Sequence, residues 1–152
     1  MVNWVVRLKA EDLDAIRKHG ESAYPHECCG LLLGRLQNEE KVFEEIYPVA
    51  NTWEEESQRN RFLISPVQLI QGEKHAREEN LEVLGFYHSH PEAQADPSKF
   101  DLENAWPFYS YIIVSVRERR ARELNSWRMV EDRSRFEPET IIPIEPEESN
   151  RS

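Results

Sequence analysis

The sequence Leu81-Glu-Val-Leu-Gly-Phe-Tyr-His-Ser-His-Pro91 decides the expected fold, because an apolar run with β-strand character ends there at two histidines and a proline. Side chains on a strand point to the same face at every second residue, so His88 and His90 leave the backbone on one face, about 6–7 Å apart. Two imidazoles placed in this way can converge on one ion. The stretch therefore predicts a strand that ends at a metal site.

A carboxylate follows the histidines at a spacing that favours the start of a helix. Asp96-Pro97 is typical of a first helical turn, with the aspartate as N-cap, the Ser98 hydroxyl left free and Asp101 a few residues further on. Taken alone, Ser98 and Asp101 would form an ordinary capping pair. Two strand-end nitrogens and one carboxylate make the open three-ligand set of catalytic zinc, with water in the fourth position. We therefore expect a zinc ion held by Asp101 and the two histidines.

Glu27 is the candidate for the base beside such a site. It stands immediately before the apolar run Cys28–Gly34, where a carboxylate would be partly desolvated. A carboxylate in this place can take a proton from water and pass it to a leaving nitrogen. Ser98 is the candidate donor to the oxyanion, a role worth about 2.7–4 kcal/mol where a comparable donor is removed.

Length and charge limit the classes of function. A chain of 152 residues fits one domain, which we place at residues 1–144, and the Pro-, Glu- and Ser-rich segment 145–152 is predicted to be a disordered acidic tail. The chain has 29 Asp plus Glu against 19 Lys plus Arg, a formal net charge of −10. This excess argues against nucleic acid or an anionic membrane as the main partner.

The cysteines and the N-terminus favour the cytoplasm. Cys28 and Cys29 are adjacent, and neighbouring cysteines rarely form a disulfide because the bond strains the peptide between them. Buried apolar packing is the expected use of both thiols. The first residues show no basic leader with an apolar core, and no run approaches the roughly 20 apolar residues of a membrane span. The oligomeric state is left open.

Apolar periodicity predicts the remaining elements. Strands are expected over residues 4–8, 28–34, 41–49, 61–64, 109–116, 124–130 and 136–144, and helices over residues 10–19 and 66–80. The strand 28–34 is expected to be buried on both faces, and 109–116 to be central in the sheet. This order of elements indicates an α/β (α+β) fold.

Three details of this assignment can be tested separately. Gly20 is expected as the C-cap of the first helix. The apolar face of the helix 66–80 is expected to contain Val67, Leu69, Ile70, Lys74 and Ala76. The polar loop 51–60 is expected to expose Trp53, and long loops of this kind often border sites.

The combined pattern of Glu27, His88-Ser-His90-Pro91, Ser98 and Asp101 resembles the JAMM (MPN-plus) metalloprotease motif. Residues 24–34 also look like the start of its small bacterial branch, and the similarity covers residues 4–130. The resemblance implies an MPN/JAMM fold, a mixed β-sheet flanked by helices and similar to cytidine deaminases. It also implies zinc ligation by the two histidines and Asp101, with Glu27 as general acid and base and Ser98 supporting the oxyanion.

The same resemblance implies peptidase or isopeptidase action at the C-terminus of ubiquitin or a ubiquitin-like protein. In the bacterial branch the implied partner is the C-terminal tail of a sulfur-carrier protein. The chain is too short for the long insertions with which eukaryotic members grip ubiquitin, so the substrate stays open.

Two other functions compete with this hypothesis. A non-catalytic MPN-type interaction module could retain the fold and a metal ion, and a fourth protein ligand would favour it because structural zinc sites usually have four. A small-molecule deaminase is weaker, since its Pro-Cys-x-x-Cys ligand pattern is missing from this sequence. A His-x-His pair alone would also be weak evidence for a metal.

Overall fold

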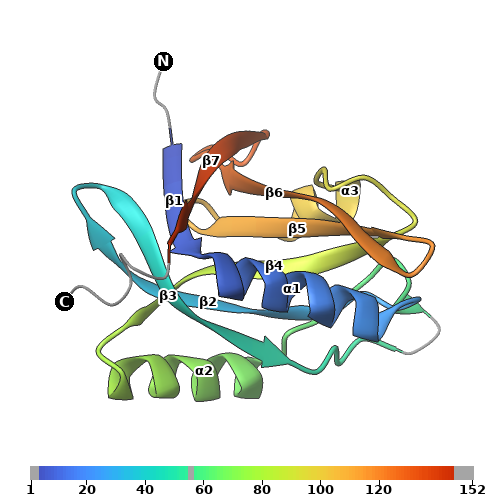
Figure 1. The fold of residues 1–152 in the computed structure, drawn as a ribbon, viewed down its shortest axis with the longest axis horizontal. Coiled ribbons are helices and arrows are strands. Elements are labelled where there is room, and N and C mark those ends of the chain that lie inside the picture. Colours follow the sequence, from blue (N-terminus) through green and yellow to red (C-terminus); the bar gives the residue numbers. More distant parts are fainter. Residues whose placement is uncertain (1–3, 55–56, 146–152) are drawn as a thin grey trace.

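Seven strands of a mixed sheet close into a barrel in the order β1-β3-β2-β4-β5-β6-β7 (Figure 1). The computed structural model describes residues 4–54 and 57–145. The strands are β1 Trp4–Lys9, β2 Cys29–Gln37, β3 Glu40–Val49, β4 Glu82–Pro91, β5 Ser110–Arg117, β6 Arg120–Met129 and β7 Phe136–Ile144. The helices are α1 Ala10–Ala23, α2 Pro66–Glu78 and α3 Lys99–Asn104. The predicted α+β class is confirmed.

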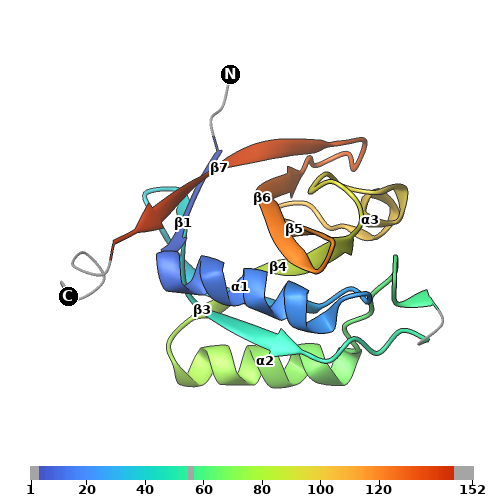
Figure 2. The same ribbon diagram turned by 45° about the vertical axis from the view of Figure 1, so that its right-hand side comes forward.

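The helices α1 and α2 pack on opposite faces of the sheet, and β3 runs between them (Figure 2). Leu13 and Ile16 of α1 join the main core with Leu32, Tyr87 and other buried residues. A second cluster, formed by Leu31, Leu33, Ala76 and Leu81, lies between the sheet and α2. A third cluster joins α3 to β5 and β6 through Ala105, Tyr111 and Met129, with Leu102 packed against it.

Alternation along β4 decides where the histidines point. Tyr87 belongs to the core that contains α1, whereas Phe86 packs with the clusters on the α2 and α3 side. His88 and His90 follow Phe86 at intervals of two, so they face the same side as Phe86. The strand therefore presents both imidazoles to α3.

Several strand predictions are confirmed. Residues Cys29–Gly34 of β2 are buried without alternation, and β3 pairs with β2 in antiparallel register. β5 lies between β4 and β6, as expected for a central strand, and residues Ser110–Val116 are all buried. Continuous burial explains why both sequences are predominantly apolar.

The prediction that Gly20 caps the first helix is wrong. α1 continues to Ala23, and Gly20 lies buried within it. A Cβ at this position would meet Val116 Cγ2 at 3.0 Å, Val114 Cγ1 at 3.2 Å and Ser89 Cβ at 3.3 Å. The glycine therefore permits close approach of the helix to β4 and β5, and sequence alone does not distinguish this use from a cap.

The expected apolar face of α2 is also wrong in part. Val67 and Ile70 are 63% and 64% exposed, whereas Gly72 and Ala76 are the buried residues of the helix. A Cβ on Gly72 would lie 2.1 Å from Leu31 Cδ1, so the small residue sets how closely α2 approaches the sheet. Arg61–Ile64, predicted as a strand, has no strand assignment and continues the loop before α2.

Two further expectations concern the ends of the chain and membranes. β7 ends at Ile144, and the predicted disordered tail 145–152 lies, apart from Glu145, outside the described residues. Among the helices of the described residues, none combines the length and apolar character that crossing a bilayer requires.

Gly30→Ala tests the packing that holds β4 against β2. Gly30 pairs with Tyr87, and an added Cβ would lie 2.1 Å from Tyr87 Cε2. We expect a loss of about 1–3 kcal/mol in the free energy of unfolding, measured by urea denaturation. In the control Gly20→Ala the nearest side-chain atom lies 3.0 Å from the added Cβ and the helix gains propensity, so its stability should change less. Wild-type stability of Gly30→Ala would contradict this packing.

Candidate metal centre

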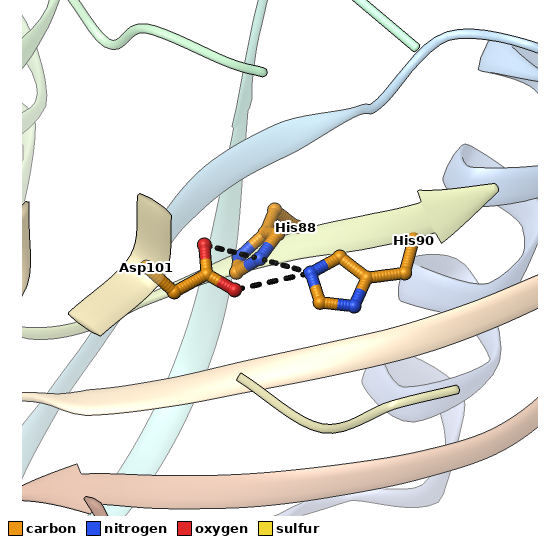
Figure 3. A group of neighbouring side chains, drawn as sticks. All are labelled: His88, His90 and Asp101. Carbon is orange, nitrogen blue, oxygen red and sulfur yellow. Dashed lines mark hydrogen bonds and ion pairs between the residues drawn. The ribbon is translucent and has the colours of Figure 1, made fainter. Parts of the chain in front are cut away.

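Three side chains, two imidazoles and one carboxylate, meet at the end of β4 and form a triangle of groups (Figure 3). His88 Nε2 and His90 Nε2 are 3.1 Å apart. Asp101 Oδ1 lies 3.1 Å from His88 Nε2, and Asp101 Oδ2 lies 3.1 Å from His90 Nε2. Ligands about 2.0–2.1 Å from a tetrahedral zinc ion would be separated by about 3.3–3.4 Å. The triangle is therefore of the size that one zinc ion requires.

A capping box at the start of α3 orients Asp101. The Ser98 hydroxyl accepts a hydrogen bond from the Asp101 backbone N–H at 3.1 Å, and the Ser98 N–H donates to Asp101 Oδ2 at 2.8 Å. Ser98 is thus the N-cap, and the prediction that Asp96 caps this helix is wrong because the helix begins only at Lys99. The Ser98 hydroxyl is exposed and keeps its own hydrogen for donation.

Hydrogen bonding leaves His90 ready to act as a ligand. His90 Nδ1 lies 2.9 Å from the carbonyl oxygen of Gln94. Since a carbonyl only accepts, Nδ1 carries the hydrogen, and the lone pair of Nε2 points at the triangle. This arrangement is common for histidines that bind a metal.

His88 is held by stacking in a dry environment. Its ring stacks on Phe62 with centroids 4.5 Å apart and an interplanar angle of 23°. Nδ1 of His88 is buried and has no hydrogen-bond partner among the described residues. Burial lowers the pKa of His88, which favours the neutral imidazole that can bind a metal.

The pairing of β2 with β4 brings Glu27 to the same place. Cys29 pairs with His88, and the Cys28 N–H donates to Ser89 Oγ at 2.8 Å. Extending this antiparallel register by two residues beyond the Cys29–His88 pair would set Glu27 across from His90. Glu27 also lies near enough to Asp101 for that carboxylate to raise its pKa. Glu27 is only 5% exposed. Residues 61 positions apart in sequence are thus neighbours at the end of two strands.

The two carboxylates of the site have opposite electrostatics. The pKa of Glu27 is raised to about 9, first by burial and second by the nearby Asp101, while Arg61 opposes the shift. Burial would also raise the pKa of Asp101, but the two imidazoles outweigh it and hold this pKa well below its ordinary value. Asp101 is therefore the permanent anion, and Glu27 is a carboxyl group that can hold a proton at neutral pH.

The loop between β3 and α2 adds residues that the sequence did not single out. The Asn51 side-chain N–H groups donate to the carbonyls of Glu27 at 3.1 Å and Arg61 at 3.0 Å, and its Oδ1 accepts from Trp53 N at 3.0 Å and Leu63 N at 3.1 Å. The Asn51 side chain thus connects the loop to the backbone of Glu27. The only sequence signal was the length and polarity of the loop, which indicated a site border but no particular residue.

An apolar groove of about 610 Å³ lies beside the triangle. It shares three aromatic residues with a smaller cavity of about 30 Å³ that His88 and Asp101 line, namely Phe62, Phe100 and Tyr111. Trp53, predicted to be exposed, is half-buried here and packs edge-to-face on Phe100 with centroids 5.6 Å apart. The groove is therefore continuous with the candidate metal centre.

Glu27→Gln should stabilise the metal-free protein above pH 4.5. The pKa rises from 4.5 to about 9 on folding, so between these values the folded chain keeps a proton that the unfolded chain releases, and stability falls as the pH rises. Removing the carboxylate should restore about 1–3 kcal/mol at pH 8. Urea denaturation in a chelator should show this gain shrinking toward pH 4, with the exposed Glu82→Gln as control. A loss of stability at pH 8 would contradict the burial of Glu27.

Comparison with known proteins identifies the family. The family described as prokaryotic homologs of the JAB domain matches residues 9–130. A desampylase of Haloferax volcanii is 32% identical over 113 residues, covering 71% of this chain and 78% of the relative. A CysO-cysteine peptidase of Mycobacterium tuberculosis is 29% identical over 140 residues, covering 91% of this chain and 92% of the relative.

A solved structure shares this fold. The solution structure of protein DSY2949 from Desulfitobacterium hafniense has a TM-score of 0.81 and 27% sequence identity, and the match covers 97% of this chain and 99% of that protein. The two relatives described above are a desampylase and a peptidase by name, which supports a hydrolase. The resemblance seen in the motif is thus confirmed, and the chain belongs to the family of prokaryotic JAB-domain proteins.

Proposed function

We propose that the chain is a zinc-dependent metallopeptidase or isopeptidase that cleaves residues or adducts from the C-terminus of a ubiquitin-like, sulfur-carrier protein. The observation that carries the proposal is the triangle of two imidazoles and a carboxylate with separations of 3.1 Å, with a second buried carboxyl group at the end of the adjacent strand. An open set of three ligands and a proton-holding group is what metal-assisted hydrolysis requires.

His88, His90 and Asp101 would hold the metal. The donor set fits zinc, since it combines two neutral imidazoles with a carboxylate and its ligand atoms all lie within 4.8 Å of one another. A bound zinc ion supplies Lewis acidity, which lowers the pKa of water to about 7 and polarises a carbonyl group. The capping box and the Gln94 carbonyl orient the ligands before any ion arrives.

Glu27 would carry the proton. Its position opposite His90 sets the carboxylate beside the ligands without making it one, and burial keeps competing water away. As general base it takes a proton from the attacking water, and as general acid it passes that proton to the leaving nitrogen. Cleavage therefore ends with a carboxylate on the carrier and a free amine on the departing group.

Ser98 would stabilise the developing oxyanion. Its oxygen accepts the Asp101 N–H, so the hydroxyl hydrogen remains to donate to an oxygen of the substrate carbonyl. The exposure of Ser98 leaves room for the substrate above α3. The exposed Ser98 hydroxyl would thus act from the rim of the site, whereas the buried Glu27 would act from its interior.

The carrier's C-terminal tail would approach along the apolar groove. The names of the relatives, desampylase and CysO-cysteine peptidase, point to proteins released from a covalent adduct as the substrate class. We place the reaction in the cytoplasm, where free thiols such as the buried Cys28 and Cys29 persist. Nucleic acid and membranes are not proposed as partners of a chain with a net charge of −10.

A cleavage assay tests the proposal. CysO and ubiquitin, each fused to a short C-terminal extension, are incubated with zinc-loaded protein, and the products are followed by mass spectrometry. We expect cleavage at the end of the carrier sequence, one zinc ion per chain by elemental analysis, and loss of that zinc in His88→Ala.

Glu27→Gln provides the matched control. It should keep the zinc and lose at least about 100-fold in kcat, because the general base is removed without a ligand. Cleavage that persists at the wild-type rate in Glu27→Gln would contradict the mechanism. A folded, zinc-loaded protein that cleaves neither carrier would favour a non-catalytic interaction module.

A further inference from the structure

Arg61 is a cation that lies near Glu27 at the candidate site. The Asn51 amide donates to the carbonyls of both Glu27 and Arg61, so the two backbones lie one side-chain amide apart. The guanidinium lies over the Phe100 ring, 4.7 Å from its centroid, and Phe100 precedes the ligand Asp101. Arg61 is therefore fixed between the proton-holding carboxyl group and the helix that carries a ligand.

The guanidinium has donors to spare. Arg61 Nη1 donates a hydrogen bond to the carbonyl of its neighbour Asn60 at 2.9 Å. Arg61 takes part in none of the ion pairs found among the described residues. Guanidinium presents five N–H donors in a fork that matches a carboxylate. In a chain with ten more acidic than basic residues, this half-buried arginine interacts electrostatically with Glu27 but makes no direct ion pair among the described residues.

The position of Arg61 beside Glu27 defines what it can reach. In the proposed reaction Glu27 gives a proton to the leaving nitrogen, so that nitrogen lies beside Glu27. When the leaving group is a single amino acid, its α-carboxylate is attached to the carbon that bears this nitrogen. A cation next to Glu27 is thus next to the α-carboxylate, which Glu27 and Asp101 would otherwise repel.

We propose that Arg61 binds the α-carboxylate of a single amino acid at the end of the carrier, so that the enzyme releases C-terminal amino acids. The inference rests on the proposed function and narrows its substrate class. A lysine isopeptide is a poorer fit, because its leaving nitrogen is Nζ and carries no carboxylate within reach.

All atoms and protons of the hydrolysis are accounted for when Arg61 only binds the substrate. Water adds across the last peptide bond, the C–N bond breaks, the oxygen stays on the carrier as a new carboxylate, and a proton ends on the α-amino nitrogen of the released residue. Arg61 stays protonated throughout and contributes binding and orientation. It is a specificity residue for the leaving side of the substrate.

Matched substrates separate this inference from the function on which it rests. CysO with one extra C-terminal alanine is prepared as the free acid and as the primary amide, and a third form carries lysine joined through Nζ. We expect kcat/KM to be at least about 10-fold higher for the acid than for the amide or the isopeptide. Equal rates for acid and amide, or a preference for the isopeptide, would overturn the inference and leave the hydrolase intact.

Arg61→Gln should lower kcat/KM for the acid by about 10- to 100-fold and that for the amide by a clearly smaller factor, because the effect of Arg61 on Glu27 is lost for both substrates and the carboxylate contact only for the acid. Arg61→Lys should retain part of the preference, because it keeps the charge and loses the fork. The control Arg59→Gln removes the same charge from an exposed position of the same loop and should leave the preference unchanged. An equal loss on both substrates in Arg61→Gln would indicate a structural role and would contradict the proposal.

Binding gives a second readout that needs no turnover. In zinc-loaded Glu27→Gln, calorimetry should show about 10-fold tighter binding of the acid than of the amide, and Arg61→Gln in this background should abolish the difference. Equal binding of the two forms would overturn the role of Arg61 even if neither is cleaved, whereas failure of cleavage alone would count against the proposed function.

Discussion

The antiparallel pairing of β2 with β4 is the constraint on which the site depends. Cys29 opposes His88 in this register, and the Cys28 N–H bonds to Ser89, so the chain before β2 must pass the end of the histidine strand. A slip of one residue would turn both histidines to the opposite face, toward the core that contains α1. Gly30 secures the register locally, because the Tyr87 ring occupies the space of a side chain at that position.

A second constraint lies in the short helix α3. Its capping box uses Asp101 to satisfy the Ser98 N–H and thereby holds the same carboxylate toward the two imidazoles. Capping and ligation are thus two uses of one side chain. Asp101 Oδ2 accepts from Ser98 at 2.8 Å while it lies 3.1 Å from His90 Nε2, so the carboxylate is oriented before it binds anything. Such pre-organisation is what a site needs to hold an ion in a fixed geometry.

How much the sequence predicted depends on the range of the interactions involved. The ligand triangle was predictable because strand alternation and a helix start position all three residues within one short stretch. The identity of the cap was not, since Asp96-Pro97 and Ser98 both carry cap signals and only the observed start of α3 at Lys99 decides between them. Gly20 was assigned to a helix end, because a glycine needed for packing against β5 has the same letter as a glycine needed for a turn.

The roles of the residues in the loop before α2 could not be predicted from the sequence, for a different reason. Asn51, Arg61 and Phe62 follow no period, and their places are set by contacts with Glu27, Phe100 and His88 from distant parts of the chain. On α2 the prediction is right for Ala76, which is buried, and for Leu69, which packs against the same cluster. It is wrong for Val67 and Ile70, which are exposed, and it missed Gly72, which is buried. Small residues that permit close packing are weak signals in a hydropathy pattern.

The identity of the atoms that would surround a bound zinc ion tests the proposed site most directly. Cys29 pairs with His88, so its sulfur is the alternative ligand to test, although it does not join the cluster of His88, His90 and Asp101 and burial raises the pKa of its thiol to about 12, which disfavours the thiolate. X-ray absorption spectroscopy of the zinc-loaded protein separates the two. The account predicts one zinc ion with only nitrogen and oxygen neighbours at about 2.0–2.2 Å, and a sulfur neighbour at about 2.3 Å would contradict it.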